Sequence, residues 1–98
     1  MAEKIRWSPK AVDNFEEICR FIGKNSEYYA AIFARKIVSI VTNIPSFPES
    51  GRIVPEYQDK NLREKIFQNY RIVYRIKGEV IEIVTISHAA KQFKIENV

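Results

Sequence analysis

A chain of 98 residues with 46% hydrophobic content is long enough for one compact domain and too short for two. Three glycines and four prolines, without a repeat or a biased tract, argue against a linker, a solenoid or a disordered tail. The net charge of +4 is modest, and the start MAEKIRWSPK lacks the apolar segment of a signal peptide, so we expect a cytoplasmic protein without a membrane span.

The charge is concentrated in the second half of the chain. Residues 60–94 contain eight cations and three anions, an excess larger than the net charge of the whole chain. Such a surface suits a polyanion or an acidic protein partner, although it is also typical of an ordinary solvated basic face.

The composition argues against a metal site and against a reactive cysteine. The single Cys19 cannot form an internal disulfide, and one histidine, His88, provides no cluster of ligands at metal-binding spacing. We therefore expect no metal and no cofactor. Cys19 lies on the apolar stripe of a predicted helix, where a small buried hydrophobe is the simplest interpretation.

Two amphipathic helices are predicted in the first half of the chain. Ser8 followed by Pro9 is typical of a helix start, and apolar residues then recur at three- and four-residue spacing until Gly23. A second helix begins after a cap at Asn25 or Ser26 and ends at the first proline of PSFPES. Because the break between them is short, the two helices should form an antiparallel hairpin.

The remaining segments are predicted to be strands. EKIRW precedes the helices, and RIV, LREKIF, YRIVYRI and VIEIVTIS follow them, each bounded by turn residues. This order indicates an α+β fold of plan β-α-α-β-β-β over residues 1–98, a plan that counts three of the four later segments as strands of the sheet. We expect an antiparallel sheet with the helical hairpin packed on one face.

The alternation of the last two strands assigns their faces. A two-residue turn at Lys77-Gly78 would set Ile76 opposite Glu79. The core face then carries Tyr70, Ile72, Tyr74, Ile76, Ile81 and Ile83. The other face, which should be open to solvent, carries Arg71, Val73, Arg75, Glu82, Val84 and His88.

The position of Arg63 and Lys65 depends on the preceding turn. A two-residue loop at Gln68-Asn69 would place both cations on the apolar face, where unpaired charges are costly. We therefore predict a three-residue loop over 67–69, which pairs Lys65 with Arg71 and puts Leu62 and Ile66 into the core. This register gathers five side chains on one concave surface: Arg63, Lys65, Arg71, Arg75 and His88. Alternatively, the cations only keep a one-sided sheet soluble.

The whole pattern resembles the RelE/ParE superfamily of type II toxins. The resemblance rests on the element order, on YRIVYRI, on the KGE turn, on IEIVTISH with a basic residue soon after, and on GRIVPE upstream. It covers essentially the whole chain and is most specific over residues 51–91. It implies a small toxin that is neutralised by a cognate antitoxin protein, and we expect that antitoxin to be acidic because the toxin is basic.

The superfamily resemblance leaves two targets open. RelE-like toxins enter the ribosomal A site and cleave mRNA, and the basic residues of that reaction correspond here to Arg63, Lys65, Arg71 and, roughly, Lys91. The C-terminal tyrosine of the RelE pattern has no match. His88 could take its place, because histidine is the side chain suited to proton transfer at neutral pH without a metal.

ParE-like toxins share the scaffold and block DNA gyrase without a known hydrolytic site. The stretch GRIVPEYQDKNLRE and the histidine after the last strand are closer to this group, so we favour the ParE-like interpretation, with Arg63, Arg71 and Arg75 contacting the target. A plain nucleic-acid-binding module is a further alternative. It would require aromatic side chains on the basic face, whereas Tyr70 and Tyr74 are predicted to face the core.

Overall fold

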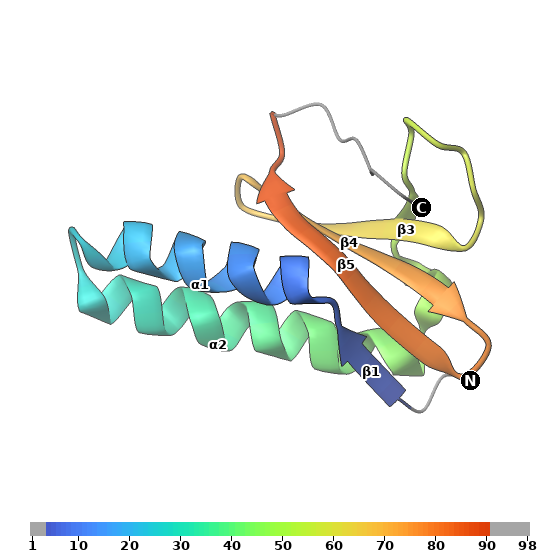
Figure 1. The fold of residues 1–98 in the computed structure, drawn as a ribbon, viewed down its shortest axis with the longest axis horizontal. Helices are drawn as coiled ribbons and strands as arrows, with labels where there is room; N and C mark the ends of the chain where they lie inside the picture. The colour runs from blue at the N-terminus through green and yellow to red at the C-terminus, as the bar shows by residue number, and fades with distance from the viewer. Residues whose placement is uncertain (1–3, 91–98) are drawn as a thin grey trace.

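The computed structural model describes residues 4–90, which fold as two helices packed on one five-stranded sheet (Figure 1). Two short 3-10 turns, η1 and η2, follow the second helix. The elements in chain order are β1 (Lys4–Trp7), α1 (Pro9–Gly23), α2 (Glu27–Asn43), η1 (Ile44–Ser46), η2 (Pro48–Ser50), β2 (Arg52–Ile53), β3 (Leu62–Phe67), β4 (Tyr70–Lys77) and β5 (Val80–His88).

The helical hairpin begins and ends where the sequence predicts. The Ser8 hydroxyl accepts a hydrogen bond from the Ala11 amide at 3.0 Å, and Ser26 accepts one from the Tyr29 amide at 3.1 Å, so both helix starts are capped by serine. Figure 1 shows the two helices side by side, with their connection projecting beyond the sheet. None of the helices within residues 4–90 is long and apolar enough to cross a membrane.

The sheet is mixed rather than wholly antiparallel, which corrects the prediction. Its strand order is β1-β5-β4-β3-β2, and β1 pairs in parallel with β5, from Lys4 opposite Val80 to Trp7 opposite Ile83. The other three pairings are antiparallel. Strands joined by tight turns must run antiparallel, whereas β1 reaches the outer edge of β5 through the helical hairpin and is free of that constraint.

The hairpin between β4 and β5 confirms the predicted core face with a different turn. Lys77 pairs with Val80 and Ile76 with Ile81, so the two loop residues are Gly78 and Glu79, and Gly78 adopts a φ of 58°. This register is two positions away from the predicted one. An even shift leaves every side chain on its face.

The main core lies between the helices and the central strands. Phe33, Ile37 and Val41 of α2 are buried against Ile72 and Tyr74 of β4 and their neighbours on β5. Ile76 and Tyr70 pack at the margin of this cluster, as predicted.

The opposite face is not open, which is a second correction. A smaller apolar cluster of Val54, Leu62 and Val73 is buried there, with Val84 packed against it. Val54 belongs to the connection between β2 and β3, residues 54–61, which we call the strap. The strap reaches this face of the sheet through Val54 and through an ion pair of Glu56 with Arg71. Ile66, predicted to enter the core, is 49% exposed.

Candidate functional site

The turn between β3 and β4 places Arg63 and Lys65 on the helix side of the sheet. Phe67 pairs with Tyr70, so the loop has two residues, Gln68 and Asn69, and Gln68 adopts a φ of 53°. Arg63 then lies opposite Tyr74, and Lys65 lies opposite Ile72. The predicted three-residue loop and the pairing of Lys65 with Arg71 are therefore wrong.

This register avoids the expected burial cost because the helices do not cover the whole sheet. Among the described residues of β3, only Phe67 joins the main core, whereas β4 and β5 supply most of its strand residues. The Arg63 guanidinium lies beyond the helices and donates hydrogen bonds to the carbonyl oxygens of Lys60, Glu49 and Gly51 at 2.8, 3.1 and 3.0 Å. The Arg63 side chain thus holds β3 to the η2 turn through hydrogen bonds.

Lys65 occupies a partly buried position at the end of α2. It borders a cavity of about 340 Å³ together with Ile40, Asn43 and Phe47. It faces neither the strap nor Arg71. Arg63 and Lys65 therefore both lie on the side of the sheet opposite to the one predicted.

Arg71 lies on the strap side, as predicted, but is 4% exposed. Its guanidinium donates to Glu64 at 2.7 Å and forms two parallel bonds to the Glu56 carboxylate at 2.8 and 2.9 Å. Arg52 forms a further ion pair with the other oxygen of Glu64. We call these four residues, Arg52, Glu56, Glu64 and Arg71, the ion cluster.

The ion cluster balances two cations with two carboxylates in a partly dry environment. Hydrogen bonding to Glu56 and to Glu64 raises the pKa of Arg71 further above its ordinary value, although burial opposes that shift. A fork of two parallel bonds is the strongest way in which a guanidinium binds a carboxylate, and phosphate uses the same geometry. The Glu56 carboxylate therefore stands where an external phosphate would have to bind Arg71.

Arg75 also points to the strap side, as predicted. It pairs across the strands with Leu62 and Glu82, and its guanidinium lies 4.0 Å from the carboxylate of Asp59 in the strap. With 18% of its side chain exposed, Arg75 remains more accessible than Arg71, whose side chain is 5% exposed.

His88 does not lie with Arg71. Tyr74 pairs with Ile83 but Val73 pairs with Thr85, so Val84 is an extra residue in β5, and the alternation of faces shifts by one beyond it. His88 consequently lies opposite Tyr70, with the two rings 5.7 Å apart in an edge-to-face arrangement. The prediction that His88 shares a face with the arginines is wrong because it assumed an uninterrupted alternation.

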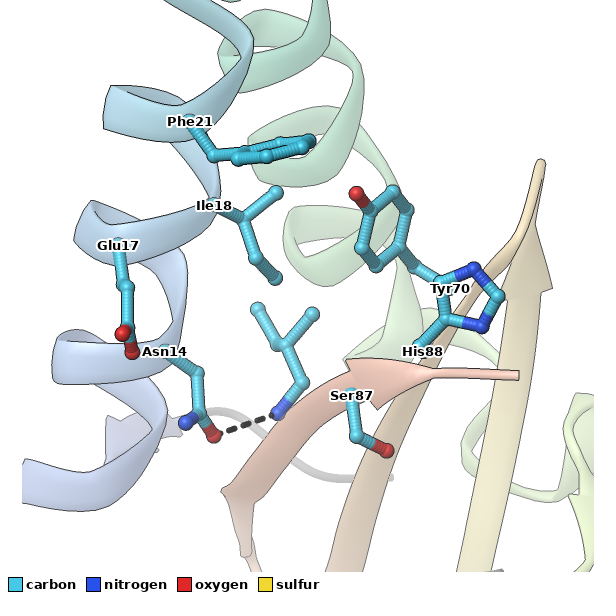
Figure 2. A pocket seen from close by; sticks show the side chains of 8 residues that line it. Asn14, Glu17, Ile18, Phe21, Tyr70, Ser87 and His88 are labelled. Carbon is cyan, nitrogen blue, oxygen red and sulfur yellow. Dashed lines mark hydrogen bonds between the residues drawn. The ribbon is translucent and has the colours of Figure 1, made fainter. Parts of the chain in front are cut away.

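Figure 2 shows His88 at one side of a cavity of about 330 Å³ between α1 and the end of β5. Ile18 and Phe21 of α1 approach it from the helix, and Tyr70 lies between Phe21 and His88 in the view. The Nδ1 atom of His88 accepts a hydrogen bond from the Ala90 amide at 3.2 Å. The described residues that line the cavity with His88 are apolar, aromatic, neutral polar or acidic, and none of them is a cation.

Lys91, the remaining predicted site residue, lies outside residues 4–90, which the structure describes. Within that range, no three histidine, cysteine, aspartate or glutamate side chains are placed to hold a metal ion together. Cys19 is partly buried against the main core, and burial raises the pKa of its thiol.

A family model described as "ParE toxin of type II toxin-antitoxin system, parDE" matches residues 5–93. The chain belongs to the ParE toxin family. A curated relative named as a candidate toxin, Y4kP from Sinorhizobium fredii, is 33% identical over 93 residues, which is 93% of each chain.

Solved structures agree with this ParE fold. A chain of the chromosomal ParDE system from P. aeruginosa matches with a TM-score of 0.71 at 19% identity, covering 87% of this toxin and 94% of that chain. The RelBE2 toxin–antitoxin complex from Mycobacterium tuberculosis matches with a TM-score of 0.64 at 15% identity, covering 90% of this toxin and 99% of the matched chain.

Sequence reasoning about the ParE-family toxin missed the two carboxylates that hold Arg71. Glu64 could have been found from the alternation along β3. With the two-residue turn, Arg63 and Lys65 lie on the helix side of the sheet, so Glu64 lies on the other side, with Arg71. Glu56 carries no comparable signal. It belongs to the irregular strap, where no period relates sequence position to direction.

Proposed function

We propose that this ParE-family toxin arrests growth by inhibiting DNA gyrase without cleaving RNA. The observation that carries the proposal is the ion cluster, in which Arg71 is 4% exposed and bound on both sides by carboxylates. A nuclease would need this arginine to stabilise the developing charge on a phosphate. Here a phosphate would first have to displace Glu56 from a charge-assisted pair.

The arrangement of the other predicted residues favours the same function. Arg63 is bound to three backbone carbonyls, and His88 lies on the other side of the sheet from Arg71. Cleavage without a metal requires a base, an acid and cations around one phosphate. No such group is assembled within residues 4–90.

The proposal includes a cognate antitoxin as the neutralising partner. The family is defined by type II toxin-antitoxin systems, and the similar solved structures come from ParDE and RelBE systems. Because the second half of this chain carries the excess of positive charge, an acidic antitoxin would be attracted to it. Expression of the toxin alone should arrest growth, and co-expression of the antitoxin should restore it.

Two assays with purified toxin distinguish gyrase from ribosome-bound mRNA as the target: supercoiling by gyrase and translation-dependent cleavage of mRNA, measured in parallel. We expect inhibition of supercoiling and intact mRNA. His88→Ala should inhibit gyrase as well as the wild-type toxin does, and Glu27→Gln, on the exposed start of α2, serves as a surface control. Ribosome-dependent cleavage that leaves supercoiling unaffected, and that His88→Ala lowers by about a hundredfold or more, would overturn the proposal.

A further inference from the structure

The cavity beside His88 has an aromatic wall that the proposed function does not use. Tyr70 and His88 form one side of it, and Phe21, which is 66% exposed, projects from α1 on the other (Figure 2). Ile18 and Ile86 form its apolar floor. A phenylalanine in this position offers a ring face to a visiting group rather than to the core.

Polar groups with unused hydrogen-bonding capacity border this wall. The Asn14 Oδ1 accepts hydrogen bonds from the Thr85 hydroxyl at 2.6 Å and from the Ile86 amide at 3.1 Å, so the orientation of the amide is set by β5. The Glu17 carboxylate is exposed one turn further along α1 and has no ion-pair partner among residues 4–90. Among the residues that the structure describes, the cavity therefore combines aromatic rings, an apolar floor and a carboxylate without an ion-pair partner.

This combination selects for a cation on an apolar stem. The faces of aromatic rings attract cations, and arginine in particular stacks its planar guanidinium on them. The methylene groups of the stem suit an apolar floor, while the charged head remains at the rim. A phosphate or another anion would be repelled by Glu17, and a neutral aromatic group would leave its carboxylate unpaired.

We propose that this cavity binds an arginine side chain presented by a partner protein. The guanidinium stacks against Phe21 and pairs with the Glu17 carboxylate, and the aliphatic stem packs on Ile18 and Ile86. The charge of the site is opposite to that of the basic second half of the toxin. It therefore recognises a basic position on a partner, and it does so whether or not the toxin inhibits gyrase.

The proposal is tested by titrating the full-length toxin with N-acetyl-arginine amide and following backbone amide resonances by NMR. N-acetyl-citrulline amide, which has nearly the same shape without the charge, is the matched ligand control. We expect saturable shifts at Tyr70, Ser87 and His88 with the arginine derivative, and binding of the citrulline derivative weaker by about fivefold or more.

Variants of α1 locate the contact. Glu17→Gln and Phe21→Ala should each weaken arginine binding by about fivefold, whereas Asp13→Asn, which removes an equal charge from the same helix outside the cavity, should change it less than twofold. Circular dichroism checks that each variant is folded. If Phe21→Ala fails to fold, Glu17→Gln still tests the proposal by itself, because the Glu17 side chain is exposed and its replacement should leave the fold intact. Equal binding of the two derivatives, equal effects of Glu17→Gln and Asp13→Asn, no saturable shift, or a preference for uridine monophosphate would each overturn the proposal.

Discussion

A methyl group added at Gly51 would lie 2.6 Å from the Tyr74 hydroxyl oxygen and 2.7 Å from the Glu64 carbonyl oxygen. Neither neighbour can move freely, because one is backbone and the other is buried. Gly51→Ala should therefore lower the free energy of unfolding by about 1–3 kcal/mol or more, measured by urea denaturation. Gly23→Ala is the matched control. Its added methyl group would lie an ordinary 3.7 Å from Ala30, so little or no loss is expected.

Because the Tyr74 hydroxyl is buried, the free energy of unfolding should vary with pH in the alkaline range. It donates to the Pro48 carbonyl at 2.6 Å and accepts from the Gly51 amide at 3.0 Å, and burial raises the pKa of Tyr74 above its ordinary value of 10.0. The neutral form is thus favoured in the folded state. The stabilisation that the neutral Tyr74 hydroxyl gives the folded state is complete below about pH 10 and is lost as the pH rises through the raised pKa of the folded state.

Tyr74→Phe tests this dependence. The substitution should cost about 1–3 kcal/mol at neutral pH because two buried backbone groups lose a partner. Above about pH 10 the difference between wild type and variant should shrink, since phenylalanine cannot ionise. Urea denaturation at a series of pH values measures both effects. A difference that stays constant across the alkaline range would contradict the argument.

Glu56 is the member of the ion cluster whose removal gives the clearest result. Its side chain is 21% exposed, so Glu56→Gln keeps the shape and removes one carboxylate from Arg71 while Glu64 stays in place. We expect a loss of about 1–3 kcal/mol in the free energy of unfolding, less than for a fully buried pair. Glu49 is the exposed control: its side chain is 77% exposed and its carboxylate lies 4.0 Å from Arg63. Glu49→Gln should lower the free energy of unfolding by no more than about 0.5 kcal/mol.

At the scale of elements, the two helix caps differ in what else they hold. The Ser8 hydroxyl caps α1 and also donates to the Val84 carbonyl at 2.8 Å, whereas Ser26 caps α2 at an exposed site. Ser8→Ala should therefore cost about 1.5–3 kcal/mol and Ser26→Ala about 1 kcal/mol or less in thermal or urea unfolding. Equal losses would mean that the contact of Ser8 with β5 contributes nothing.

Both helices and the core face of β4 and β5 could be predicted because their signals are local. Serine, proline and the 3.6-residue period bound α1, and strict alternation assigns Ile72, Tyr74, Ile81 and Ile83 to one face. Pairing registers depend on the turn and on what covers each face. The prediction for β3 failed because it assumed that the helices cover the entire sheet, so that Arg63 would be buried without a partner.

The bulge in β5 could not be predicted for a related reason. Nothing in VIEIVTISH distinguishes an extra residue at Val84 from continuous alternation, since Val84 and Thr85 both fit a strand. The bulge follows from tertiary contacts instead. Ile86 enters the main core, and the Asn14 amide of α1 binds both Thr85 and Ile86.

At the scale of the whole molecule, Phe33 links α2 to the β3–β4 hairpin. It is 4% exposed, and its ring lies 5.2 Å from Tyr70 and 5.9 Å from Phe67. Phe33→Ala should lower the free energy of unfolding by about 3–5 kcal/mol. Tyr28→Ala, on the same helix with 70% exposure, should change it by less than about 0.5 kcal/mol.

The same experiment reports on cooperativity. Because one core joins α2, β4 and β5, helix content followed by circular dichroism and the fluorescence of Trp7, which packs at that core, should change at the same urea concentration. Separate transitions for the two probes would show that the helical hairpin and the sheet unfold independently.

The extra residue in β5 also has a genetic consequence. Deletion of the Val84 codon would leave Ile83 opposite Tyr74, Thr85 opposite Val73 and His88 opposite Tyr70, so β5 would lose its bulge while the other side chains kept their faces. If Val84 instead alternated regularly with its neighbours, every later residue of β5 would shift by one position and the imidazole would lie on the face of Arg71. One codon can therefore be lost at this point of β5 in descendants of this gene without changing which side chains lie beside the arginine.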